Sequence, residues 1–189
     1  SIFSGLMPLQ IEKMFPELWV DEDSEEGKNL NEAPLIRTQI ERFRKKYTFS
    51  YHKVHDSQYN DKLLNIVPSL FHNQLNVVVL NFVDMLSHAR TENKMIRELA
   101  QSEAAYRSLT RSWFQHSGTL ELFKRIAGKG YKVIVTTDHG TIRVDNPQKV
   151  IGDKNTNTNL RYKVGKNLNY NPKEVFDIRF PDKAGLPSP

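Results

Sequence analysis

The stretch Asn76-Val-Val-Val-Leu-Asn-Phe-Val-Asp-Met-Leu-Ser-His88 decides the fold class of this chain. Its first eight residues are nearly all apolar and rich in β-branched side chains, which is typical of a strand buried on both faces, as in a parallel sheet. The polar residues Asp84 and His88 follow at once. The stretch therefore predicts a core strand that delivers an acid and a histidine to its carboxyl end.

A second stretch of the same kind, Tyr131-Lys-Val-Ile-Val-Thr136, comes about 50 residues later and leads into Asp138-His139-Gly140. Helical patterns fill the space between the two strands, from about Glu92 to His116 and from Thr119 to Ala127. Strand, helices and strand in this order indicate a parallel crossover. We expect an α/β fold with three layers, helix, sheet and helix, around a mostly parallel sheet.

Upstream of the core strand, the pattern predicts three further elements. Apolar residues at helical spacing favour a helix over Asn31–Lys45, and alternation over Tyr47–Tyr51 favours a strand. A second helix covers Leu63–Leu70, bent or restarted at Pro68. Because Ile2, Phe3 and Leu6 enter a turn with no cap or linker before them, we also expect residues 1–189 to be the interior of a larger domain, cut at both ends.

Composition limits the classes of protein and of metal site. At 189 residues and 38% hydrophobic content, the chain is long enough for one globular domain. It has no apolar run near the roughly 20 residues that span a bilayer, and it opens with no signal peptide. It also has no cysteine, which excludes disulfides and thiolate zinc sites. Any zinc in this chain must therefore be held by histidine and carboxylate, and the absence of cysteine suits a cytoplasmic protein.

The net charge of +5 is unevenly distributed. Residues 1–35 hold eight acidic side chains against Lys13 and Lys28, whereas residues 143–166 hold six basic side chains against Asp145 and Asp153. A basic stretch raises the local concentration of ligands that carry phosphate. The alternative is a solvated loop whose lysines do nothing specific.

Each predicted core strand ends in an acid followed closely by a histidine. Asp84 and His88 lie one turn apart if a helix begins after the strand, and Asp138 and His139 are adjacent in a turn that Gly140 permits. Reactive groups of open α/β sheets gather beyond the carboxyl ends of the strands. Taken singly, each pair has an ordinary interpretation, since Asp84 can cap a helix and a histidine can decorate a surface. Together they predict a metal site with carboxylate and imidazole ligands.

The two pairs resemble the alkaline phosphatase superfamily, including its nucleotide pyrophosphatases and phosphodiesterases, and Gly5-Leu6-Met7-Pro8 resembles a segment that follows the nucleophile helix in those phosphodiesterases. More narrowly, the chain resembles the PglZ-type effector domain of PorX-type response regulators, which regulate type IX secretion in bacteria of the Bacteroidetes group. The four stretches that carry this resemblance are Ile2–Pro8, Asn81–Thr91, Val135–Thr141 and Gly152–Tyr162.

The resemblance implies two zinc ions, with Asp84 and His88 on one and Asp138 and His139 on the other. It places the family's nucleophilic threonine about two helical turns before Ser1, a further aspartate ligand upstream of that, and a third histidine ligand late in the domain. After His139 this chain has no histidine. We therefore expect the 189-residue piece alone to be catalytically inactive and to bind zinc weakly or not at all.

The other histidines match no motif of the family, and we expect them to be structural or exposed. They are His52, His55, His72 and His116.

In an intact domain, the resemblance implies hydrolysis of phosphomonoesters or diesters, with nucleotides or short oligonucleotides as substrates. Four residues of the basic stretch are then candidates for contact with substrate phosphates: Lys154, Asn155, Asn157 and Arg161. The implied partners are an upstream receiver domain, a sensor kinase or sigma factor, and a second copy of the full protein, with no membrane.

Two other functions remain open. One is a regulatory interaction module that keeps the phosphatase fold without turnover, and zinc without hydrolysis would favour it. The other is a nucleic-acid binding domain that uses the basic face. The chain carries no known binding motif, and its first 35 residues are acidic, so this alternative is weak.

Overall fold

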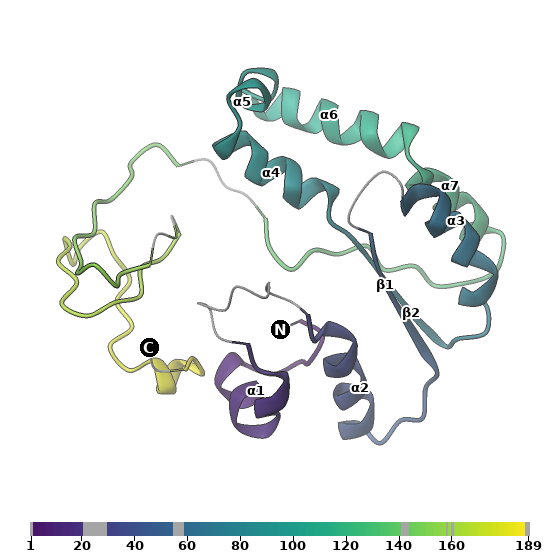
Figure 1. Cartoon of the computed structure of the whole chain (residues 1–189), viewed down its shortest axis with the longest axis horizontal. Coiled ribbons are helices and arrows are strands. Elements are labelled where there is room, and N and C mark those ends of the chain that lie inside the picture. The colour runs from purple at the N-terminus through teal and green to yellow at the C-terminus, as the bar shows by residue number, and fades with distance from the viewer. Residues whose placement is uncertain are drawn as a thin grey trace. The chain divides into compact units, whose positions relative to one another are not determined.

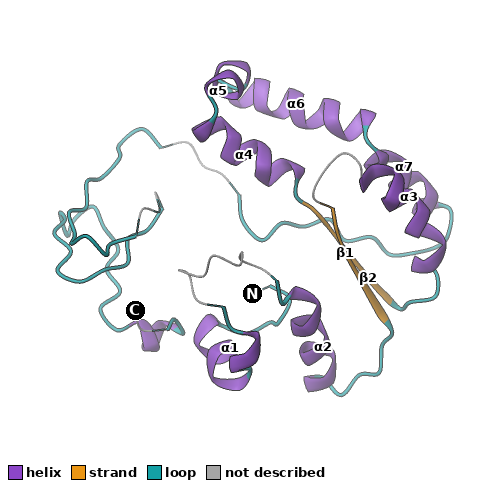
Figure 2. Ribbon diagram, in the orientation of Figure 1, coloured by secondary structure: helices purple, strands orange, loops and turns teal. Residues whose placement is uncertain are grey.

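The computed structural model describes residues 2–20, 30–54, 59–140, 144–157, 159 and 161–187. The chain forms two compact units, one of Ser1–Arg44 with Ile142–Pro189 and the other of Lys45–Thr141. Each unit is described by itself. Helices, strands and connecting loops are shown in Figures 1 and 2.

The unit Lys45–Thr141 is built on two parallel strands, β1 (Phe49–Val54) and β2 (Leu75–Leu80), which pair in register from Phe49 opposite Leu75 to Val54 opposite Leu80. Helix α3 (Tyr59–Leu70) connects them, as a parallel pair requires. It contains Pro68 and runs as a single helix, so the expected restart at that residue is wrong.

One face of the sheet packs against α3 and α7 (Gly118–Ala127), which lie side by side in Figure 1. The centre of this core is fully apolar: it consists of Val54, Val67, Leu70 and Leu122, each 7% exposed or less. Val78 and Leu80 of β2 pack against it from the sheet. Burial of these side chains fixes the position of β2, and thus the place where its carboxyl end lies.

Three helices join β2 to α7. They are α4 (Phe82–Glu92), α5 (Lys94–Leu99) and α6 (Glu103–His116). Their own small core contains Leu86, Ala100 and Tyr106. The Ser102 side chain caps α6 by accepting a hydrogen bond from the backbone N–H of Ala105 at 3.1 Å.

The second predicted core strand is not formed. Residues 131–137 make no strand, and Val133, Ile134 and Val135 are 48%, 87% and 77% exposed. The expectation of burial on both faces is also wrong for β2, whose side chains are half-buried or exposed. A β-branched run becomes a strand only where a neighbouring backbone pairs with it, and within the described residues the sheet has two strands. The α/β class with a parallel sheet is nevertheless confirmed.

The other unit contains α1 (Pro8–Met14), α2 (Glu32–Arg42) and two short 3₁₀ helices, η1 (Pro16–Leu18) and η2 (Pro181–Ala184). A backbone hydrogen bond connects its two chain segments: the N–H of Leu9 donates to the carbonyl of Gly185 at 2.9 Å. The predicted helix over Asn31–Lys45 is confirmed, with its end three residues earlier. In the described part of the chain, no helix is both long and apolar enough to cross a membrane.

Candidate metal-binding and catalytic site

Asp84 lies just beyond the carboxyl end of β2, inside the first turn of α4. The backbone N–H of Asn81 still bonds to the Val54 carbonyl of the neighbouring strand at 3.2 Å, and the helix begins one residue later at Phe82. The strand therefore passes into the helix without a loop. Asn81, and not Asp84, is the N-cap residue, so capping does not explain the carboxylate.

His88 follows one turn later on the same face of α4. Its Nε2 lies 3.6 Å from Oδ1 of Asp84. The i, i+4 spacing brings the two side chains together, as expected for neighbours on a helix surface. The first pair of predicted ligands thus converges through the geometry of a single helix.

The second pair reaches the same carboxylate from a distant part of the sequence. His139 places Nε2 3.5 Å from Oδ1 of Asp84, and 3.7 Å from Oδ1 of its neighbour Asp138. The segment that carries it follows α7, which ends at Ala127. Near the start of this segment, the Tyr131 hydroxyl donates to the Leu70 carbonyl at 3.2 Å. The structure therefore brings all four predicted side chains into one cluster, which we call the Asp84 cluster.

Oδ1 of Asp84 is buried and accepts no hydrogen bond, although the side chain as a whole is 46% exposed. A carboxylate oxygen excluded from water normally has a partner, because losing its hydration is costly. Two imidazole nitrogens lie near it, at distances of 3.6 and 3.5 Å that are too long for a good hydrogen bond. A cation bound next to this oxygen would give it the partner that no hydrogen-bond donor provides.

The donor set fits zinc in its chemistry. Tetrahedral zinc holds nitrogen and oxygen ligands at about 2.0–2.2 Å, so neighbouring ligand atoms are separated by roughly 3.3–3.6 Å. The separations in the Asp84 cluster are 3.5, 3.6 and 3.7 Å. Among the described residues, however, no three or more His, Asp or Glu side chains are arranged to hold a single ion. The cluster is a set of converging pairs and not a full coordination shell.

Glu92 was missed by the sequence analysis. Its Oε1 lies 3.9 Å from Nδ1 of His88, on the side of the ring away from Asp84. The signal was present, since Asp84, His88 and Glu92 recur at intervals of four residues along a predicted helix.

The proposed phosphate-binding residues belong to the other unit, in a loop closed by Ile151 and Asn169. These two residues exchange backbone hydrogen bonds of 2.9 and 2.7 Å. Inside the loop, Oδ1 of Asn157 accepts the backbone N–H of Val164 at 3.0 Å, and its carbonyl accepts Nζ of Lys163. Asn157 therefore organises the loop itself.

Lys154, Asn155 and Arg161 of the same loop are exposed. Gly165 allows the tight packing beneath them, because a Cβ there would approach the Thr156 backbone to 3.2 Å.

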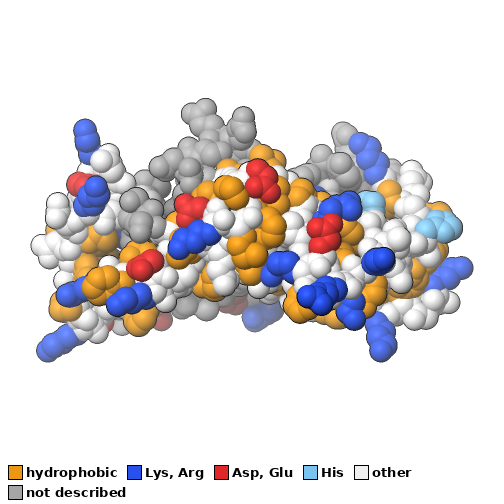
Figure 3. All heavy atoms as spheres, turned by 90° about the horizontal axis from the view of Figure 1, so that it is seen from below, with side chains coloured by type: hydrophobic (Ala, Val, Ile, Leu, Met, Phe, Trp, Pro, Cys, Tyr) orange, Lys and Arg blue, Asp and Glu red, His pale blue; other side chains and the backbone are white. Residues whose placement is uncertain are grey.

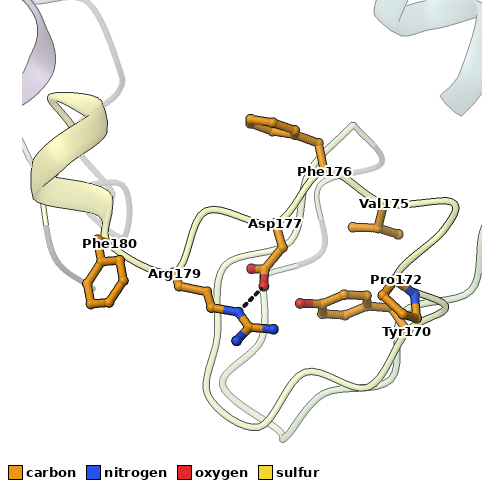
Figure 4. Close-up of a pocket in the computed structure, with 7 residues that line it drawn as sticks. All are labelled: Tyr170, Pro172, Val175, Phe176, Asp177, Arg179 and Phe180. Carbon is orange, nitrogen blue, oxygen red and sulfur yellow. Dashed lines mark hydrogen bonds and ion pairs between the residues drawn. The ribbon is translucent and has the colours of Figure 1, made fainter.

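The structure also forms an open hollow that contains none of the predicted site residues. It is lined by Tyr170, Pro172, Val175, Phe176, Asp177, Arg179 and Phe180 (Figure 4). Nε of Arg179 donates to Asp177 at 2.8 Å. This bond, followed by one from the Tyr170 hydroxyl, lowers the pKa of the Asp177 carboxyl. The carboxylate in turn raises the pKa of Tyr170. The residues that line the hollow include one carboxylate and no histidine, so they do not form the donor set of a metal site.

Comparison with known families gives one match over the whole chain. The model of the BREX system PglZ alkaline phosphatase-like domain matches residues 1–189. No curated protein matches the chain. A match of this extent agrees with the α/β fold and its parallel sheet. The chain belongs to the PglZ family of alkaline phosphatase-like domains.

Proposed function

We propose that this domain acts, in the intact protein, as a zinc-dependent hydrolase of phosphoric esters, with nucleotides or short oligonucleotides as substrates. Membership of an alkaline phosphatase-like family points to phosphoesterase chemistry. The observation that carries the metal assignment is the buried, unbonded Oδ1 of Asp84, approached by imidazoles from two distant parts of the sequence.

Asp84, His88, Asp138 and His139 would hold the metal. When bound, zinc would polarise the phosphoryl group and lower the pKa of an attacking hydroxyl. The chain's own contribution is to orient the donors. Helix α4 fixes the Asp84 carboxylate at the end of β2, and the segment after α7 brings the second imidazole onto the same oxygen.

The wider setting is part of the same proposal. The resemblance to PorX-type effector domains supports a response regulator with an upstream receiver domain, acting in type IX secretion. The exposed Lys154, Asn155 and Arg161 are proposed as phosphate contacts. Figure 3 shows lysine and arginine side chains interspersed with hydrophobic ones on the face drawn.

The experiment uses the intact protein and two readouts, bound zinc by elemental analysis and hydrolysis of a chromogenic phosphodiester. Replacing Asp84 and His139 together with alanine should remove both zinc and activity, because each contributes to the cluster. The matched control is His72→Ala, an exposed histidine outside it, which should change neither.

Two results would contradict the proposal. Full activity in the double variant would place the chemistry elsewhere. Zinc that depends on Asp84, with no hydrolysis of any phosphoester, would instead favour the regulatory interaction module.

A further inference from the structure

The imidazole of His88 lies between two carboxylates of its own helix. Asp84, His88 and Glu92 are spaced by four residues, so they form one stripe along α4. Nε2 faces Oδ1 of Asp84 at 3.6 Å, and Nδ1 faces Oε1 of Glu92 at 3.9 Å. The two ring nitrogens are thus directed at different partners.

A neutral imidazole carries its proton on one nitrogen and its lone pair on the other. A metal can bind only the nitrogen that has the lone pair, so a ligand histidine needs its proton on the far side of the ring. In the Asp84 cluster the far side is Nδ1, which faces Glu92. We propose that Glu92 is a positioning residue that accepts a hydrogen bond from Nδ1–H of His88 and so directs the Nε2 lone pair toward a bound zinc ion.

The position of Glu92 in the helix supports a role other than helix stability. It is the last residue of α4, where a negative charge interacts unfavourably with the helix dipole. A side chain that stabilises this end of the helix would be positively charged or neutral. Glu92 also lies on the Nδ1 side of the ring, away from the oxygen of Asp84 that the imidazoles approach, so it is placed to support a ligand and not to be one.

The separation of 3.9 Å is longer than a formed hydrogen bond. The side chains of His88 and Glu92 are 66% and 74% exposed, so both can change rotamer. If the His88 ring were fixed on a metal, a change of rotamer of Glu92 alone would bring its carboxylate within hydrogen-bond distance of Nδ1. The inference rests on the proposed function, since it needs His88 to bind the metal.

The test measures the dissociation constant for zinc, by competition with a chromogenic chelator, in the intact protein. Glu92→Ala should weaken zinc binding by about 10–100-fold, the usual cost of losing the carboxylate behind a ligand histidine. Glu92→Gln keeps an acceptor oxygen and should lose less. Glu98→Ala, an exposed glutamate on α5, is the matched control and should leave the affinity unchanged.

Two further measurements separate positioning from a structural role. The metal-free Glu92→Ala protein should be as stable as the parent or more so, because an unfavourable charge has left the helix end. In a His88→Ala background, Glu92→Ala should cause no additional loss of zinc affinity, because the glutamate acts through that imidazole.

The outcomes distinguish this inference from the proposed function. If Asp84→Ala abolishes zinc binding while Glu92→Ala has no effect, the role of Glu92 is overturned alone. A loss of affinity from Glu92→Ala that persists in the His88→Ala background also overturns it. If Asp84→Ala leaves zinc binding intact, both the metal site and the role of Glu92 are overturned.

Discussion

Two buried polar atoms without a hydrogen bond differ in what surrounds them, and the surroundings indicate which of them could bind a metal. Nε2 of His52 and Oδ1 of Asp84 are both buried without a hydrogen bond. Asp84 is approached by two imidazoles, whereas His52 lies opposite Val78 in the sheet, and Val78 packs into the apolar core under α3 and α7. The surroundings of Asp84 suit a cation, whereas the surroundings of His52 provide no hydrogen-bond partner for its Nε2.

We predict that His52→Val raises stability and flattens its dependence on pH. Burial lowers the pKa of His52 below 6.5, so the unfolded chain binds the proton more readily. The His52 contribution to stability is therefore complete above pH 6.5 and is lost as the pH falls below that value. Removing the unsatisfied nitrogen should add about 1 kcal/mol to the free energy of unfolding at pH 7.

Urea denaturation at pH 7.5 and pH 5 measures both effects, with His72→Val as the exposed control. An unchanged difference between the two pH values in His52→Val would show that another group is responsible.

At the scale of elements, α4 is held by α6 next to the candidate site. The Tyr106 hydroxyl of α6 donates to the Val83 carbonyl at 3.1 Å, one residue before Asp84. Its ring is only 9% exposed and lies under the Arg90 guanidinium at 4.7 Å. Arg90 also pairs with Glu103 at 3.0 Å. One tyrosine thus links the packing of two helices to the turn that presents the carboxylate.

We predict that Tyr106→Phe costs about 1 kcal/mol of unfolding free energy, the usual net value of one hydrogen bond. It should also speed up amide hydrogen exchange in the first turn of α4, because the Val83 carbonyl loses its hydrogen bond to α6. Tyr47→Phe, at a residue that is 47% exposed, should change the free energy by less than about 0.5 kcal/mol. Equal effects of the two changes would mean that the Val83 bond contributes nothing.

The loop closed by Ile151 and Asn169 gives a second prediction at this scale. Replacing Lys154 and Arg161 with alanine in the intact protein should raise the KM for a nucleotide substrate while zinc stays bound, because the exposed cations are lost and the Asn157 bonds that shape the loop remain. Steady-state kinetics and metal analysis measure the two effects. Unchanged kinetics would return these residues to the role of an ordinary solvated loop.

The sequence predicted local elements better than it predicted pairing. Helix α2 and the strands β1 and β2 were predicted from periodicity and β-branched content, which act within a few residues. The strand bounds differ: Tyr47–Tyr51 was predicted where β1 covers Phe49–Val54, and residues 76–83 were predicted where β2 covers Leu75–Leu80. Residues 131–136 are rich in β-branched side chains, as β2 is, but form no strand, because pairing depends on a neighbouring backbone and not on propensity alone.

The candidate site was predictable for the same local reason, and its metal role stays a prediction. Asp84 and His88 meet because of helix geometry alone. The approach of His139 was expected from a second parallel strand over residues 131–136, which is not formed. The contact depends instead on the path of the chain after α7, which no periodicity encodes.

At the scale of the whole molecule, all four donors of the Asp84 cluster belong to the unit Lys45–Thr141. Two come from α4 and two from the segment that follows α7. That segment exposes Ile134 and Val135 and forms no ladder in the described structure. Zinc bound by these pairs would hold the segment next to α4, where His139 lies 3.5 Å from Asp84.

We therefore predict that, in the intact protein, zinc protects the unit Lys45–Thr141 and not the other unit. At a free zinc concentration of 100 times the dissociation constant, the stabilisation should be about 2.7 kcal/mol. Hydrogen exchange measured by mass spectrometry should slow in residues 131–140 and in α4, while α1 and α2 exchange as before, because they contribute no donor. In the variant with Asp84 and His139 replaced by alanine, the protection should disappear. Protection that survives in this variant, or that is strongest in α1 and α2, would place the zinc outside the Asp84 cluster and would leave the phosphoesterase proposal without its metal.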